Sequence, residues 1–151
     1  LLAVTGVEDK LQDDVCLTLE KLRNAGIRIW MLTGDKVETA TNIAVSTRLF
    51  SRDKRILQYQ RLTSEGECRN LILTLRRTRN CCLVIDGPSL QLVMTTMQAD
   101  FMEVSQGLDA VVCCRCTPTQ KADVACMIRK YSGGKQVACI GDGGNDVSMI
   151  Q

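Results

Sequence analysis

The sequence predicts an α/β domain with a mainly parallel β-sheet. Short apolar runs alternate with amphipathic stretches along the chain, which is typical of strands joined by helices. Polar clusters follow three of the apolar runs directly, where α/β sheets bind their ligands. With 151 residues, 45% of them apolar and 24% charged, the chain suits one globular domain.

The expected elements follow from the spacing of apolar and turn-forming residues. Strands are expected at residues 2–5, 27–32, 83–86, 110–114 and 137–140. Val15, Leu19 and Leu22 recur at helical spacing, and Gly26 supplies the left-handed residue that often follows a helix. Further helices are expected at residues 37–44 and 119–131, the second entered through Pro118.

Residues 48–80 differ from the rest and are expected to form a surface insertion. This stretch is richer in Arg and Lys, has weaker periodicity and carries a polar break at residues 63–67. Leu71 and Leu75 predict one helix within it, and its other parts have no clear assignment.

Composition excludes several classes of function. The formal net charge is +2, and the longest basic run is Arg76-Arg77, so a nucleic-acid surface is not expected. The sequence has nine cysteines and no histidine, and most of the cysteines lie in apolar runs. We therefore expect them to be small buried apolar residues rather than zinc ligands. No apolar run approaches the roughly 20 residues that span a bilayer. Neither end carries a signal peptide or a helix stop, so both are expected to be cuts through a larger protein.

The strongest motif is Gly-Asp-Gly-Gly-Asn-Asp at residues 141–146, directly after an apolar run. Asp142 and Asp146 would place two carboxylates at the end of a strand, and carboxylate oxygens suit Mg²⁺. The alternative is a plain turn, in which Asp and Asn serve the turn geometry alone.

Two further motifs follow other apolar runs. Thr33, Gly34 and Asp35 combine a hydroxyl with the free amides of a strand-to-helix turn, which can hold a phosphate; the alternative is a helix cap. Lys121 stands near the start of a helix, where the dipole does not favour a cation, so an anion is expected beside it. The alternative there is a solvated lysine.

These three motifs are expected to converge, because the carboxyl ends of parallel strands share one edge of a sheet. Together they would provide phosphate donors, a positive charge and a metal site, which are the needs of phosphoryl transfer. No residue of the chain is an obvious nucleophile for that reaction.

The motifs resemble those of the haloacid-dehalogenase-like phosphotransferases and, within them, the P-type ATPases. The matching runs are Thr33-Gly34-Asp35, residues 118–121 and residues 141–146. Residues 5–12, with Glu8-Asp9 and Leu11-Gln12, and residues 146–150 resemble the type IV branch, which flips phospholipids. Gly144 and residues 113–116 point to the sub-branch that works without an accessory subunit.

The resemblance implies a role for each matching residue. Thr33 and Gly34 would contact an aspartyl phosphate and Lys121 would neutralise it, while Asp142, with Asp146 close by, would hold Mg²⁺. Asn145 would help to position the phosphate, and Asp35 and Arg115 would reach the ribose side of the nucleotide. Asp9 would act near the hinge to the nucleotide-binding domain.

One departure from the family pattern affects activity. The phosphorylation motif Asp-Lys-Thr-Gly-Thr, whose aspartate is the family's nucleophile and whose strand lies in the middle of the sheet, is absent from the 151 residues. The resemblance therefore implies a partial phosphorylation domain, residues 1–151, with a three-layer Rossmann-like fold that lacks its central strand.

The resemblance also implies what the rest of the protein does. The parent would use ATP and Mg²⁺ to move phospholipid through transmembrane helices, and its nucleotide-binding and actuator domains would be this domain's partners. The chain would be a cytosolic domain of a multi-pass protein of the endomembranes or the plasma membrane. A soluble phosphatase of the same superfamily and a non-catalytic Mg²⁺- or phosphate-binding module remain alternatives.

Overall fold

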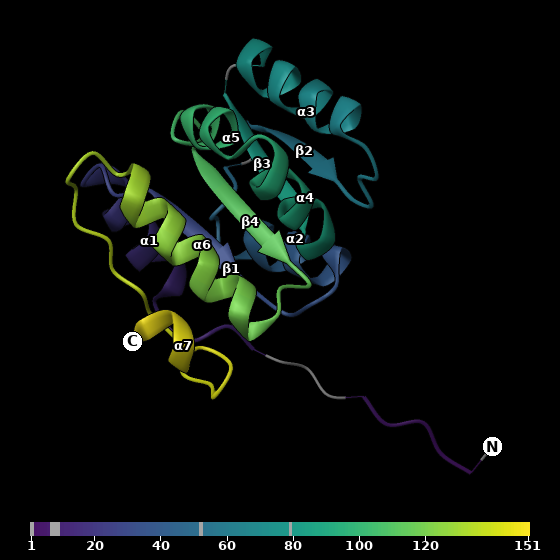
Figure 1. The fold of residues 1–151 in the computed structure, drawn as a ribbon. Coiled ribbons are helices and arrows are strands. Elements are labelled where there is room, and N and C mark those ends of the chain that lie inside the picture. Colours follow the sequence, from purple (N-terminus) through teal and green to yellow (C-terminus); the bar gives the residue numbers. More distant parts are fainter. Residues whose placement is uncertain (1, 7–9, 52, 79) are drawn as a thin grey trace.

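The computed structural model describes residues 2–6, 10–51, 53–78 and 80–151, and it has a four-stranded sheet between two layers of helices (Figure 1). The strands are β1 (Ile29–Leu32), β2 (Arg55–Tyr59), β3 (Cys81–Asp86) and β4 (Ala110–Cys114). Their order across the sheet is β1-β4-β3-β2, and every neighbouring pair is parallel. The predicted α/β class with a mainly parallel sheet is confirmed.

Burial explains which runs became central strands. All residues of β3 and β4 are buried, as expected for strands that are covered by helices on both faces. The edge strand β2 instead mixes exposed and buried residues. Register is set by pairs such as Leu57 with Leu83, and Leu83 with Val111.

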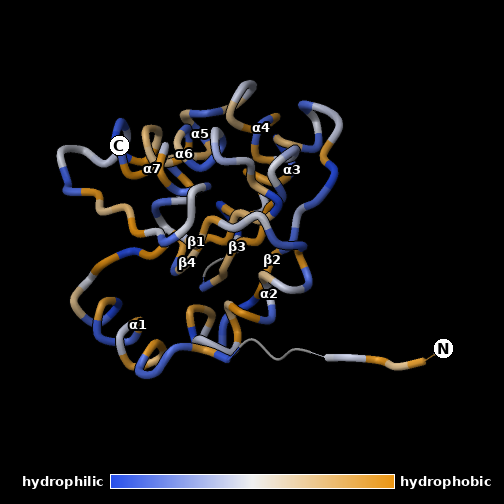
Figure 2. The backbone as a smooth tube through the Cα atoms, turned by 90° about the horizontal axis from the view of Figure 1, so that it is seen from below, coloured by the Kyte–Doolittle hydropathy of each residue, from blue (hydrophilic) through white to orange (hydrophobic). Residues whose placement is uncertain are grey.

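The helices connect the strands and cover both faces. They are α1 (Val15–Asn24), α2 (Val37–Ser46), α3 (Glu65–Arg77), α4 (Gly87–Thr96), α5 (Gln98–Ser105), α6 (Pro118–Tyr131) and α7 (Val147–Ile150). In Figure 2 the sheet lies between α1 and α2 on one side and the remaining helices on the other.

The sheet separates two apolar clusters. Leu83, Ile85 and Val111 face the larger cluster, which also contains buried residues of α3, α4, α5 and α6. Val84 and Val112 face the smaller cluster, which includes residues of α2. Alternate residues of each central strand therefore pack against opposite layers of helices.

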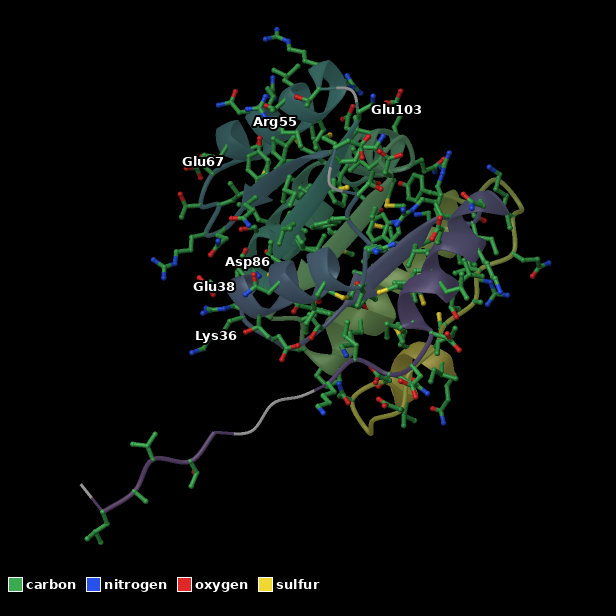
Figure 3. The ribbon with its side chains drawn as sticks, turned by 180° about the vertical axis from the view of Figure 1, so that it is seen from behind. Lys36, Glu38, Arg55, Glu67, Asp86 and Glu103 are labelled. Carbon is green, nitrogen blue, oxygen red and sulfur yellow. The ribbon has the colours of Figure 1, made fainter. Side chains whose placement is uncertain are left out.

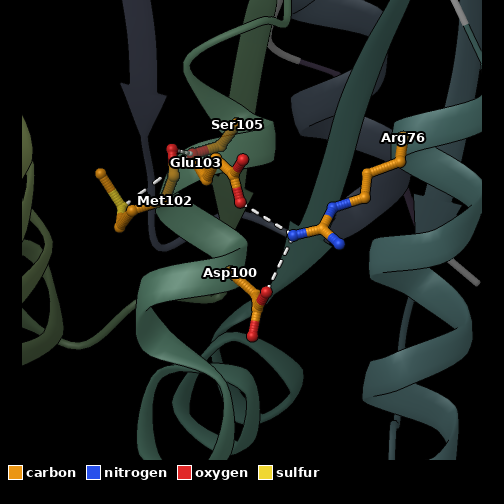
Figure 4. Close-up of polar contacts among 5 residues, drawn as sticks. All are labelled: Arg76, Asp100, Met102, Glu103 and Ser105. Atoms are coloured by element: carbon orange, nitrogen blue, oxygen red, sulfur yellow. Dashed lines mark hydrogen bonds and ion pairs between the residues drawn. The ribbon is translucent and has the colours of Figure 1, made fainter.

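Two helix starts are fixed by reciprocal side-chain caps. Ser64 and Glu67 form a capping box at α3, and Thr117 and Gln120 form another at α6. Figure 4 shows a different link, in which Arg76 of α3 lies 2.8 Å from both Asp100 and Glu103 of α5. Because these side chains are exposed, each pair contributes at most about 1 kcal/mol.

Three of the five predicted strands are confirmed: those at 27–32, 83–86 and 110–114 correspond to β1, β3 and β4. The strands predicted at 2–5 and 137–140 are wrong, because neither segment joins the sheet. Leu2 and Ile140 are exposed, so apolar character alone did not supply a pairing partner. Glu8 and Asp9 lie outside the described residues.

Helix predictions fared better, although three helices of the described chain were missed. Helices α1, α2 and α6 match the predicted segments, and Gly26 has a positive φ of 79° as expected after α1. Sequence reasoning did not find α4, α5 or the short helix α7. Residues 48–80, expected as a surface insertion, provide the edge strand β2 and helix α3, whose Cys68, Leu71, Ile72 and Leu75 are buried in the larger cluster. Within the described part of the chain, no helix is long and apolar enough to cross a membrane.

Candidate functional site at the carboxyl edge of the sheet

The loops after β1 and β4 lie side by side beyond the sheet. The Thr33 amide donates to the Cys113 carbonyl (2.9 Å), and the Cys116 amide donates back to the Thr33 carbonyl (3.0 Å). The Arg115 amide donates to the Asp35 carbonyl (2.9 Å). These bonds bring the Thr33–Asp35 motif to the start of the loop that leads to Lys121, which is one part of the predicted convergence.

Figure 3 shows how this edge relates to the whole sheet. Arg55 marks the amino end of β2, whereas Asp86 marks the carboxyl end of β3 and lies toward the side where Lys36 and Glu38 begin α2. The starts of α2, α4 and α6 therefore gather at the carboxyl edge, where their free amide groups favour anions.

The Thr33 motif is a compact turn that is open to solvent. The Thr33 hydroxyl donates to Asp35 Oδ2 (2.7 Å) and accepts the Asp35 amide (3.1 Å). Gly34 is exposed, and a side chain there would lie in ordinary contact with the Cys116 carbonyl, at 3.8 Å. The turn is therefore exposed, and its Thr33 hydroxyl and Asp35 amide are bonded within the turn in this structure.

Lys121 is buried and paired. It lies near the start of α6 with 4% of its surface exposed, and its Nζ lies 2.8 Å from Asp146 Oδ1. The hydrogen bond from Lys121 is the main reason that the pKa of Asp146 is lowered. The predicted anion beside this lysine is, in this structure, a carboxylate of residues 141–146.

Glycines allow the 141–146 turn to close on Asp146. A side chain at Gly141 would lie 2.3 Å from the Asp146 Cβ, and the Gly143 amide donates to Asp146 Oδ2 (3.3 Å). The Asp146 amide in turn donates to the Gly143 carbonyl (2.9 Å). The fold of the turn itself therefore requires glycine, whether or not a ligand binds there.

Asp142, Asn145 and Arg115 have exposed side chains. Asp142 and Asn145 belong to the turn that ends at Asp146, but no hydrogen bond or ion pair among the described residues joins their side chains to Thr33 or Lys121. Arg115 has a left-handed backbone with φ of 52°. The structure thus brings the Thr33–Asp35 turn into contact with the Arg115 loop. It also pairs Lys121 with Asp146. Asp142 and Asn145 are exposed to solvent.

The described residues contain no group of three His, Cys, Asp or Glu side chains arranged to hold a metal ion. A Mg²⁺ site needs fewer protein ligands than that, because the ion uses one or two carboxylates and takes its other ligands from water and phosphate. Asp142 offers an exposed carboxylate, and Asp146 offers a second that is shared with Lys121. The residues present fit a Mg²⁺ site of that kind.

The cysteines near the site, Cys113, Cys114 and Cys116, are buried and free. Burial raises the pKa of Cys116 to about 12 and that of Cys114 to about 11, so both thiols stay protonated at neutral pH. Cys113 and Cys116 have the Cys-x-x-Cys spacing, yet both are buried and neither forms a disulfide.

A groove of about 810 Å³ runs along the free side of β1. Among the described strands, β1 pairs with β4 on one side and has no strand on the other. Trp30 and Leu32 line the groove from β1, and Cys139 and Ile140 line it from the opposite wall. The segment that was predicted as a strand at 137–140 therefore lies across a groove from β1.

Sequence reasoning missed Asp86 and Gly87 and gave no role to Gln120, although all three lie at this edge. Asp86 is 3% exposed and caps α4 by accepting the Ser89 amide. The available signal was the run Asp86-Gly87-Pro88 after an apolar strand, because a capping residue and a proline often open a helix.

Comparison with known proteins covers the whole chain. No family model matches it. It is 54% identical over 151 residues to "Phospholipid-transporting ATPase neo1" of Schizosaccharomyces pombe and 52% identical to "Probable phospholipid-transporting ATPase IIB" of Homo sapiens. It is also 43% identical, over 162 aligned residues, to "Phospholipid-transporting ATPase DRS2" of Saccharomyces cerevisiae.

The chain corresponds over its whole length to one segment of phospholipid-transporting ATPases. All of it aligns with each of these relatives, and it spans 14%, 13% and 12% of their respective lengths. The predicted resemblance to the phospholipid-flipping branch is therefore confirmed, and the parallel α/β sheet agrees with the fold expected of such an ATPase segment.

Proposed function

We propose that this chain is the part of an ATP-driven phospholipid transporter that supplies the phosphate- and Mg²⁺-binding groups of a phosphoryl-transfer site. The observation that carries the proposal is the contact between the Thr33 turn and the Arg115 loop at the carboxyl edge of a parallel sheet. Lys121, on the helix that follows this loop, is paired with Asp146. Relatives named as phospholipid-transporting ATPases supply the class of reaction.

In the proposed site, Thr33 and Gly34 bind the oxygens of the transferred phosphoryl group. The Thr33 hydroxyl is bonded to Asp35 here and would turn to donate to phosphate. Lys121 neutralises the developing charge, and its burial makes that charge more effective than a solvated one would be. Asp146 orients Lys121 through their 2.8 Å contact.

Asp142 and Asp146 would hold Mg²⁺, with the phosphate and water as further ligands. When bound, the ion offsets the negative charge of the phosphoryl oxygens. Asn145 would position the phosphate from the same turn. Asp35 and Arg115, which are joined through the Arg115 amide, would face the nucleotide.

The nucleophile would come from the Asp-Lys-Thr-Gly-Thr segment, which the 151 residues do not contain. The groove beside β1 is a suitable place for its strand, because β1 has unpaired backbone groups there and apolar side chains line the walls. The 151-residue chain is accordingly expected to form no phosphoenzyme from ATP.

The remaining parts of the proposal concern the whole protein. ATP would be delivered by a nucleotide-binding domain, an actuator domain would act on the phosphoenzyme, and phospholipid would move through transmembrane helices. This chain would then be a cytosolic domain of a multi-pass protein of the endomembranes or the plasma membrane. Nucleic acid is not a partner in this proposal.

The test replaces the proposed metal ligand in the full-length ATPase. Asp142→Asn should lower phosphoenzyme formation from labelled ATP by a factor on the order of 10², because an amide is a poorer Mg²⁺ ligand than a carboxylate. Asp123→Asn is the matched control, since Asp123 is an exposed carboxylate on α6 away from the turn. Equal phosphoenzyme levels in Asp142→Asn and wild type would remove the metal assignment.

A further inference from the structure

Gly87 stands at a close approach between two helix starts. It is the first residue of α4 and is buried. A side chain there would lie 2.6 Å from the Arg115 carbonyl oxygen and 2.8 Å from Gln120 Oε1. The first of these is a backbone atom, so the Arg115 loop itself would have to move to admit even an alanine.

Gln120 ties the same two helix starts together. Its Oε1 accepts the Thr117 amide (3.0 Å) as part of the cap of α6, and its Nε2 donates to the Gly87 carbonyl (3.1 Å). One side chain thus closes the α6 cap and bonds the first residue of α4.

Asp86 makes this junction rigid. Its carboxylate accepts the Ser89 amide (3.0 Å) at the start of α4 and the Arg61 amide (3.2 Å) from the loop after β2. Because Asp86 is 3% exposed and bonded on both oxygens, Gly87 cannot shift freely toward solvent.

The element held by this junction is Arg115. Its backbone has the left-handed φ of 52°, which a side chain other than glycine rarely adopts without support from its surroundings. Support comes from two sides, because the Arg115 amide is bonded to the Asp35 carbonyl and the Arg115 carbonyl packs against Gly87. The Arg115 side chain itself is exposed.

We propose that Gly87 and Gln120 are positioning residues for Arg115: they fix its left-handed backbone and thereby the point from which its guanidinium reaches the nucleotide. This role rests on the proposed function, in which Arg115 faces the nucleotide. Neither residue touches substrate, and both act through the backbone at the end of β4.

The principal variant is Gly87→Ala in the full-length ATPase. The KM for ATP should rise on the order of ten- to a hundredfold, as for a displaced binding group. Inhibition by orthovanadate, a phosphate mimic that needs no nucleotide contact, should keep its wild-type concentration dependence. Gly66→Ala is the matched control, because Gly66 also lies in the first turn of a helix and a side chain there meets nothing nearer than 3.9 Å.

Gln120→Glu keeps the proposal testable if Gly87→Ala does not fold. Glutamate preserves the acceptor for the Thr117 amide and the capping box, but it removes the donor to Gly87 and places two oxygens together. The KM for ATP should rise again, with vanadate inhibition unchanged. A wild-type KM in both variants, or equal changes in KM and vanadate inhibition, would overturn the positioning role.

Arg115→Ala separates this role from the proposed function. If Arg115→Ala raises the KM for ATP while Gly87→Ala and Gln120→Glu do not, the positioning role is overturned and the nucleotide assignment stands. If Arg115→Ala leaves the KM unchanged, the nucleotide assignment of Arg115 is wrong, and the positioning role falls with it.

Discussion

Val124 links the core to the helix that carries Lys121. It lies on α6, three residues after Lys121, and is completely buried in the larger apolar cluster. Cys126 lies two residues further along the same helix and is exposed. Replacing each residue with alanine therefore compares the loss of stability when a buried side chain and an exposed side chain of one helix are shortened.

The expected cost of Val124→Ala follows from the atoms removed. Two buried carbon groups at about 0.8 kcal/mol each give about 1.6 kcal/mol of lost transfer free energy. A residual cavity of about 40 Å³ adds about 1 kcal/mol. The free energy of unfolding should thus fall by about 2–3 kcal/mol. Val and Cys have similar helix propensities, so the gain from introducing alanine cancels between the two variants.

The assay is urea denaturation of the 151-residue chain, followed by the fluorescence of its one tryptophan, Trp30. With an m-value of about 2 kcal/mol/M, Val124→Ala should lower the urea midpoint by about 1 M. Cys126→Ala should stay within about 0.5 kcal/mol of wild type. Similar midpoints for the two variants would refute the placement of α6 on this core.

Two further predictions concern titrating groups. At pH 7.5 iodoacetamide should label exposed Cys126 first, whereas Cys116, whose pKa burial raises to about 12, should react only after unfolding; labelling of native Cys116 would contradict this. Such thiols also stabilise the fold below their unfolded pKa, and that contribution is lost as the pH rises toward 12. The lowered pKa of Asp146 works in the other direction, because its stabilisation is present above the unfolded value and is lost as pH falls through the folded value. Carboxyl NMR should give Asp146 a midpoint below the ordinary 3.8, and Lys121→Met should bring it back; a wild-type midpoint at or above 3.8 would show that the ion pair is not formed in solution.

The two wrong strand predictions have one physical cause. Residues 137–140 have the composition of a buried strand, but strand formation requires a partner for the backbone groups. In this structure the groove beside β1 separates the segment from the sheet, and Ile140 is 88% exposed. Helix α4 was missed because its pattern is only weakly amphipathic: Gly87 and Ser89 lie among its buried residues, and no charged residue marks its exposed side.

The sequence by itself determined the class of fold, the family and the identities of the motif residues. It could do so because buried strands, capped helices and glycine turns are local patterns, and each leaves its mark within a few consecutive residues. The convergence of the Thr33 and Arg115 loops was also foreseeable, because parallel strands end at one edge.

Only the tertiary structure decided which groups touch. The Lys121–Asp146 pair joins residues 25 positions apart, and the contact between Gly87 and Arg115 joins two different strand ends. Such contacts depend on how helices settle on the sheet to within about 1 Å, and no local pattern encodes that. The burial of Lys121 could not be predicted for the same reason, because its position near the start of a helix does not indicate whether its side chain is buried.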